Sequence, residues 1–132
     1  MKADDQAGRP IRAAAVAESF VTLDGSSIRE FMHPNDGLCA AQSLAEARVP
    51  AAARTTLHRH HRTEEFYHLL AGRGRMILDG ERFEVGPGDT VSIAPGRAHC
   101  IENPGPDELV FLCCCAPAYS DEDTELLEDP MA

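Results

Sequence analysis

The sequence predicts an all-β protein, an antiparallel β-sandwich or barrel with little helix. Short segments that alternate apolar and polar residues follow one another, and turn signals separate them. Two turns carry an Asp-Gly pair, at Asp24-Gly25 and Asp79-Gly80, which is typical of a β-hairpin. The 132 residues suit one domain with one core, and the 10 glycines and 9 prolines favour short strands over long helices.

Taken in order, the chain begins with residues 1–19, which are expected to form a flexible segment and are polar up to about Arg12. A hairpin over residues 20–32 follows, built on the first Asp-Gly pair. Residues 38–47 are expected to form a strand with Gln42 and Leu44 on one face, although their Ala, Leu and Glu content also suits a helix.

The later strands complete the expected barrel domain, which spans residues 20–117. Two strands joined by a short loop lead into the second Asp-Gly hairpin, at residues 75–85. Residues 109–115 form a continuous apolar run, which indicates a buried strand. Residues 118–132 are expected to form an acidic tail that either caps one short helix or stays solvated.

Composition excludes several classes of partner. The net charge of −10 argues against nucleic acid and anionic membrane surfaces, because both are bound by clustered Lys and Arg. No apolar run approaches the roughly 20 residues that span a bilayer, and the N-terminus lacks the apolar core of a signal peptide. We therefore expect a cytoplasmic protein. The five cysteines, three of them in a row, suit thiols in a reducing compartment better than a disulfide framework.

Residues 57–72, LHRHHRTEEFYHLLAG, hold the densest set of metal-binding residue types. His58 and His60 stand at positions i and i+2, which point to the same face of a strand. A short loop after His60 lets the next strand return Glu65 to the same point. Two imidazoles and a carboxylate are a ligand set of iron, manganese and zinc sites. The alternative interpretation is a set of solvated polar residues on a surface strand.

A second stretch favours the metal interpretation. Residues 88–103, GDTVSIAPGRAHCIEN, place His99 at the start of a strand after a turn. Together the two stretches resemble the paired motifs of the cupin superfamily. The first motif, G-x5-H-x-H-x3or4-E-x6-G, falls here on Ala52, His58, His60, Glu65 and Gly72. The second, G-x5-P-x-G-x2-H-x3-N, falls on Gly88, Ala94, Gly96, His99 and Asn103. Alanines replace the first glycine and the proline, at turn positions rather than at ligands.

The resemblance implies a small single-domain cupin, an antiparallel jelly-roll β-barrel also described as a double-stranded β-helix. It further implies one divalent transition metal per chain (iron, manganese, zinc or nickel) bound inside the barrel by His58, His60, Glu65 and His99. Glu64 is the alternative carboxylate because it keeps strict alternation with His60, but it would turn Tyr67 away from the site.

Strand parity supplies candidates for the rest of the pocket. Tyr67 is expected to face inward, where it would act as a catalytic residue that donates a proton or orients substrate, or would simply fill the barrel. Arg54 and Thr56 share a face with the histidines. Arg54 is a catalytic candidate that would hold a substrate carboxylate, with a surface ion pair as the alternative. The weaker pocket candidates are Gln42 and Cys113, and the histidines expected to face outward are His61 and His68.

Two classes of function fit these residues. The first is a metal-dependent enzyme that acts on a small organic molecule. The resemblance includes dioxygenases, decarboxylases, isomerases, lyases and cyclases, and oxygenase-type chemistry fits a redox-capable metal with open positions. The alternative is a non-catalytic binding or sensing module, whose relatives usually carry a DNA-binding domain for which 132 residues leave no room. We also expect a homodimer, in which the hairpin of residues 20–32 pairs with a second chain that covers its sheet edge.

Overall fold

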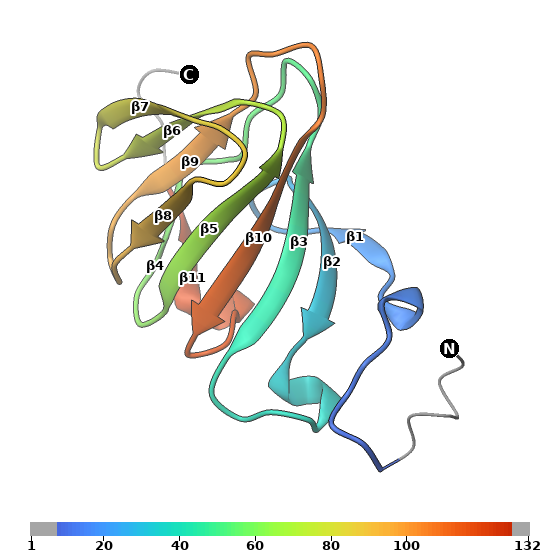
Figure 1. Ribbon diagram of the computed structural model, residues 1–132. Helices are drawn as coiled ribbons and strands as arrows, with labels where there is room; N and C mark the ends of the chain where they lie inside the picture. Colours follow the sequence, from blue (N-terminus) through green and yellow to red (C-terminus); the bar gives the residue numbers. More distant parts are fainter. Residues whose placement is uncertain (1–7, 128–132) are drawn as a thin grey trace.

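The computed structural model describes residues 8–127 and shows two antiparallel β-sheets (Figure 1). The strand order of the first sheet is β1 (Ser19–Val21), β2 (Ser27–Met32), β3 (Ser43–Val49), β10 (Leu109–Ala116), β5 (Glu64–Ala71) and β8 (Thr90–Ile93). The second sheet follows the order β11 (Thr124–Leu126), β4 (His58–His60), β9 (His99–Glu102), β6 (Gly74–Leu78) and β7 (Glu81–Val85). Helical structure in this range is confined to short 3-10 turns at η2 (Ala14–Val16), η3 (Pro34–Asp36) and η4 (Asp121–Asp123). The predicted all-β jelly-roll fold is confirmed, and no helix within residues 8–127 is long and apolar enough to cross a membrane.

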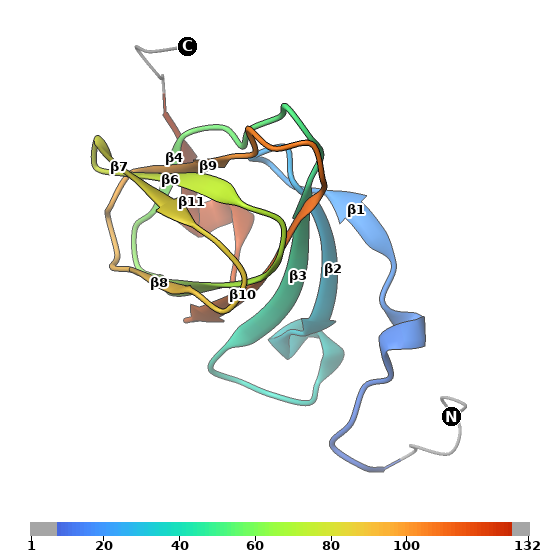
Figure 2. The ribbon, with the colours of Figure 1, turned by 45° about the horizontal axis from the view of Figure 1, so that its top comes forward.

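The two sheets enclose the core between them. Figure 2 looks into the barrel, with β8 and β10 along one wall and β4, β6 and β9 along the other. On β5, Glu65, Tyr67 and Leu69 are buried while Phe66 is exposed, as the period of two in a strand requires. The largest fully buried apolar side chains are Phe111, Leu69, Met76, Ile93, Ile101 and Leu109. Burial of each such side chain stabilises the fold by about 1.5–3 kcal/mol.

The segment with mixed helix and strand propensity forms a strand. β3 runs over Ser43–Val49, later than the predicted 38–47, and it pairs with β2 on one side and β10 on the other. Ala47 faces both Ile28 and Phe111 in that register, so sheet pairing overrides the local helix propensity. Gln42 precedes the strand and lies in a depression outside the barrel, so the pocket role expected for it is wrong.

The two Asp-Gly hairpins differ from each other. The second is the predicted tight turn, because Leu78 pairs with Glu81 and leaves only Asp79 and Gly80 between the strands. In the first, Val21 pairs with Ser27, so the loop spans residues 22–26. This wider loop closes around the Asp24 side chain, which accepts hydrogen bonds from loop residues.

The two alanine replacements fall at turn positions of the motifs, and one of them adopts a left-handed backbone conformation. Gly72 has a φ of 80°, and a Cβ there would lie 2.6 Å from the carbonyl oxygen of Glu108, so the position requires glycine. Ala52, where the motif has glycine, also adopts a left-handed φ of 65°. An alanine in this region is strained by about 1–2 kcal/mol, which the surrounding turn must offset. The structure gives no reason for Ala94 at the proline position.

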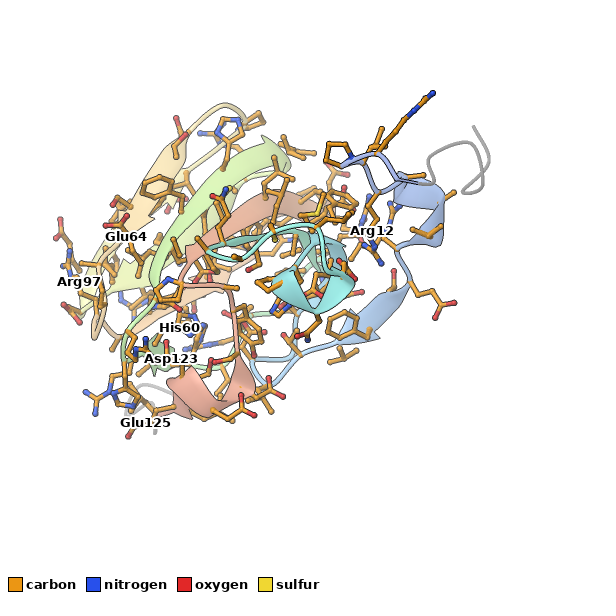
Figure 3. All side chains as sticks on the ribbon, turned by 90° about the horizontal axis from the view of Figure 1, so that it is seen from below. Arg12, His60, Glu64, Arg97, Asp123 and Glu125 are labelled. Atoms are coloured by element: carbon orange, nitrogen blue, oxygen red, sulfur yellow. The ribbon has the colours of Figure 1, made fainter. Side chains whose placement is uncertain are left out.

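Both ends of the described range pack against the barrel. The Arg12 guanidinium donates to the carbonyls of Glu30 and Phe31, so this part of the segment expected to be flexible is anchored. The acidic segment forms η4 and then β11, which pairs with β4, rather than a solvated tail. The Asp123 carboxylate accepts hydrogen bonds from the amides of Arg62 and Thr63, and Figure 3 shows it close to His60. The rest of both expected tails, residues 1–7 and 128–132, lies outside the described residues.

Candidate metal centre

Four buried side chains converge inside the barrel. β4 supplies His58 and His60, β5 supplies Glu65, and β9 supplies His99, which pairs directly with His58. All four residues are at most 4% exposed. One nitrogen or oxygen from each lies within 4.8 Å of those of the others, so the structure brings together the four residues predicted as ligands. Glu64 is exposed on the outer face of β5, which leaves Glu65 as the carboxylate of this cluster.

A backbone or hydroxyl partner fixes each imidazole. Nδ1 of His58 donates to the Thr56 carbonyl at 2.8 Å, and Nδ1 of His99 donates to the Arg97 carbonyl at 2.9 Å. Nδ1 of His60 lies 2.9 Å from the Thr124 hydroxyl, which itself donates to the Ser120 carbonyl. Since each acceptor takes the Nδ1 proton, every Nε2 carries a lone pair that faces the cluster.

The inward-facing atoms need a cation among them. Nε2 of His60 lies 3.1 Å from Oε1 of Glu65, and Nε2 of His99 lies 3.5 Å from the same oxygen. In a neutral imidazole of this tautomer Nε2 is a hydrogen-bond acceptor, and the carboxylate oxygen that it faces is an acceptor too. Nε2 of His99 is fully buried and makes no hydrogen bond within residues 8–127. Three nitrogens and one carboxylate oxygen are donors suited to a divalent transition metal, and the four residues therefore fit one.

The electrostatics of the site keep the ligands in their metal-binding forms. Burial, followed by the neighbouring His99, lowers the pKa of His58 from 6.5 to about 4, so its imidazole is neutral near pH 7. Burial opposes ionisation of Glu65. The neighbouring His60 and His99 rings nevertheless outweigh burial and hold the pKa of Glu65 well below its usual range.

Cys115 orients the carboxylate. Its thiol donates to Oε2 of Glu65 at 3.2 Å, which leaves Oε1 directed at the imidazoles of His60 and His99. Burial and the adjacent Glu65 raise the pKa of Cys115 far above its usual range, so the thiol keeps the proton that it donates. Cys113 also lines the cavity, as predicted, while Cys114 between them is exposed on the other face of β10.

A cavity opens from the cluster between β2, β3, β5 and β10. Its volume is about 540 Å³ including the open mouth, and the four-residue cluster contributes His58, His60 and Glu65 to its wall. Tyr67 faces this cavity as predicted, with its ring 4.6 Å from Phe111 and 5.9 Å from His99. The other apolar residues of the wall are Phe20, Ile28, Ala45 and Ala47.

Arg54 does not lie where strand parity predicted. Residues 55–57 are not part of a strand, so alternation is lost: Thr55 is buried and Thr56 is exposed. Arg54 pairs with Glu102 at 3.5 Å and lies in a depression outside the cavity, which corrects its expected place beside the histidines. His61 and His68 face outward as predicted, the first 3.1 Å from Glu125 and the second 2.8 Å from Thr90.

Three residues at the site were missed in the sequence. Asp24 lies in the first hairpin loop with Oδ2 3.8 Å from Nε2 of His58. Thr124 and Tyr119 come from the acidic segment, the first bonded to His60 and the second part of the cavity wall. The only sequence signal for Asp24 is Thr22 and Ser26 on either side of it, a pattern that suits hydrogen bonds to a central carboxylate.

The jelly-roll barrel and the enclosed histidine–glutamate cluster together define a class of small β-barrel proteins with an internal ligand set. The chain belongs to the cupin family, since the family model described as "Cupin domain" matches residues 45–115. It is 54% identical over 109 residues to an uncharacterised protein of Methanocaldococcus jannaschii. This match covers 83% of this chain and 87% of that protein. It is also 34% identical over 74 residues to an Escherichia coli mannose-1-phosphate guanylyltransferase, but this match spans 16% of that enzyme and 56% of this chain.

Solved structures show the same fold at lower identity. A Thermotoga maritima protein described as a predicted oxalate decarboxylase superposes with a TM-score of 0.70 at 22% identity, covering 81% of this chain and 98% of that chain. The Streptomyces nucleoside dehydratase Pac13 also superposes with a TM-score of 0.70, at 16% identity, covering 88% of this chain and 88% of that chain. KdgF from Halomonas gives 0.70 at 17% identity, with 85% of this chain and 96% of that chain covered.

Proposed function

We propose that this protein is a metal-dependent enzyme that acts on a small organic molecule. The observation that carries the proposal is the convergence of three Nε2 lone pairs and one carboxylate oxygen beside an internal cavity. His58, His60, Glu65 and His99 would hold one divalent transition metal, with iron, manganese, zinc and nickel as candidates. Such a metal, when bound with open positions, supplies Lewis-acid or redox chemistry.

Tyr67 is the proposed catalytic residue of the chain itself. Burial and the nearby Glu65 carboxylate raise the pKa of Tyr67 well above its usual range, so its phenol remains protonated. A protonated phenol in the cavity wall donates a hydrogen bond to a substrate oxygen and orients the substrate toward the cluster. Arg54 has no part in this proposal, because its ion pair with Glu102 lies outside the cavity.

Two reaction classes are proposed for the site. Oxygenase-type chemistry suits three imidazoles and a carboxylate on iron or manganese. Non-redox lyase or isomerase chemistry is favoured by a second observation, the Asp24 carboxylate beside His58, which adds a polar group next to the metal position. Dehydration also appears in the name of one solved cupin with the same fold. Oxygen consumption during turnover separates the two classes.

The proposal is tested by metal analysis of anaerobically purified protein, followed by a substrate screen. We expect one metal per chain, and turnover of one substrate class in proportion to bound metal. His60→Ala and His99→Ala should each abolish tight binding, while His61→Ala, outside the barrel, should keep it. Full metal occupancy in the two ligand variants would show that the cluster is not the site. A ligand that binds and leaves unchanged would instead identify a sensing module.

A further inference from the structure

Asp24 presents one of its two carboxylate oxygens to the metal centre. Its Oδ1 accepts hydrogen bonds from the Thr22 hydroxyl at 2.7 Å, the Ser26 amide at 2.9 Å and the Ser26 hydroxyl at 2.7 Å. The Asp24 carbonyl accepts from the Thr56 amide at 2.7 Å, which fixes the loop to the segment before β4. These bonds hold the carboxylate in one orientation, with Oδ2 directed toward His58 at 3.8 Å.

The nearest cluster atom to this oxygen is another acceptor. Because Nδ1 of His58 donates to the Thr56 carbonyl, Nε2 of the neutral ring has a lone pair and no proton. Asp24 Oδ2 and His58 Nε2 therefore cannot form a hydrogen bond with each other, because neither atom carries a proton. Oδ2 needs a hydrogen-bond donor from outside the ligand set, and Asp24 borders the cavity where a substrate beside the metal would lie.

The cavity wall carries negative charge and no fixed positive charge. Within residues 8–127, its lining includes the carboxylates of Asp24, Glu30 and Glu65 but no arginine or lysine. Three nearby arginines, Arg54, Arg75 and Arg82, pair with Glu102 instead. Arg59 of β4 pairs with Glu125. A divalent metal together with Glu65 carries one net positive charge, which Asp24 cancels. An anionic substrate therefore gains little attraction in this cavity.

We propose that Asp24 determines the class of substrate. It accepts a hydrogen bond from a hydroxyl or amine of a neutral or cationic molecule, and it disfavours carboxylate anions. This inference deepens the proposed function and rests on it, because the substrate must lie beside a bound metal. Such a substrate binds the metal through one oxygen or nitrogen and donates to Asp24 from a neighbouring atom. A dicarboxylate places negative charge against Asp24 and finds no guanidinium in the wall.

The test uses the whole protein loaded with Co²⁺, whose visible spectrum reports ligands that enter open positions of the metal. Two probes are titrated: azide, an anion without a donor hydrogen, and imidazole, a neutral ligand with an N–H donor. Asp24→Asn keeps the size of the side chain and its Oδ1 acceptor but removes the charge. We expect this variant to bind azide about tenfold more tightly and imidazole about tenfold more weakly than the unchanged protein.

Glu64→Gln is the matched control, because it removes one charge from an exposed position next to Glu65 and should leave both affinities within about twofold. Should Asp24→Asn not fold, Asp24→Ser removes the same charge and keeps a short polar side chain for the turn. An unchanged ratio of azide to imidazole affinity in a folded Asp24 variant overturns this inference and leaves the metal centre standing. Failure of the unchanged protein to bind Co²⁺, or of both azide and imidazole to enter its coordination, overturns the proposed function instead.

Discussion

The Thr124 hydroxyl lies 2.9 Å from Nδ1 of His60 and connects the C-terminal strand β11 to the metal centre. Because the hydroxyl donates its own proton to the Ser120 carbonyl, it accepts from the imidazole and sets which nitrogen faces inward. The backbone carbonyls that hold His58 and His99 cannot be removed by substitution, so Thr124 is the partner through which this orientation can be tested.

Thr124→Val should lower metal affinity by about tenfold, because loss of a ligand's hydrogen-bond partner typically costs tenfold to a hundredfold. Valine keeps the shape of the side chain and the strand, so the fold should remain. Thr124→Ser retains the hydroxyl and should stay within about twofold of the unchanged protein. Competition with a chromophoric chelator measures both, and equal affinity in the valine and serine variants would contradict the role of Thr124.

Cys115→Ala should weaken metal binding, since Glu65 loses the thiol that holds Oε2 and its carboxylate can rotate. We expect a several-fold loss, smaller than that caused by removal of Glu65 itself. Cys114→Ala is the comparison, because this exposed neighbour on the same strand faces away from the cavity. Isothermal titration of both variants with Zn²⁺ decides the point, and equal affinities in the two would count against an orienting thiol.

The metal-free protein should lose stability as pH falls from about 6.5 to about 4. The pKa of His58 is lowered from 6.5 to about 4 by burial and by His99, so the unfolded chain binds a proton in this range while the native protein does not. The free energy of unfolding then falls by on the order of 1.4 kcal/mol per pH unit from this residue. The depressed pKa of Glu65 adds a further loss below 4.5, where only the unfolded carboxylate is protonated.

Urea denaturation in the presence of a chelator, repeated from pH 7 to pH 4.5, measures this slope. His58→Gln replaces the imidazole with a group that does not titrate, and its slope should be shallower over the same range. Parallel curves for the two proteins would show that His58 is not the residue responsible.

The protein should form a homodimer through the edge of the first sheet. β1 pairs only with β2 among the described strands, and Phe20 and Val21 are 48% and 72% exposed. An exposed apolar edge strand favours pairing with a second chain, and a twofold axis is the commonest arrangement. Light scattering at micromolar concentration should give the mass of two chains, and Val21→Lys should give one. A single-chain mass for the unchanged protein would exclude this interface.

Part of the four-residue cluster was within reach of the sequence because its geometry is local, while His99 was reached through the resemblance of the second motif. His58 and His60 need only the period of two within one strand, and Glu65 needs the same period on β5 together with Tyr67. The loop between β4 and β5 interrupts the alternation that starts at His60. Alternation along β5 then places Glu65 inside the barrel with Tyr67 and leaves Glu64 outside.

Other parts of the site depend on contacts between distant segments. Arg54 was misplaced because alternation was extended through residues 55–57, where backbone pairing with Ile101 turns Thr55 inward. Asp24 looked like half of a two-residue turn, and only the wider loop directs its carboxylate to His58. Thr124 belongs to an acidic stretch whose composition is typical of a solvent-exposed segment. Pairing of β11 with β4 brings it beside His60 instead.

The cluster draws its ligands from three strands and an orienting hydroxyl from a fourth. The most distant pair in the sequence, His58 and Thr124, is separated by 66 residues. Contacts of such separation form together, when the two sheets close on each other, and not in any isolated hairpin. A metal ion would consequently recognise the closed barrel and bind partly folded chains poorly. Its binding free energy would then be added to the stability of the whole domain, which makes metal supply a control on how long the protein survives in its folded form.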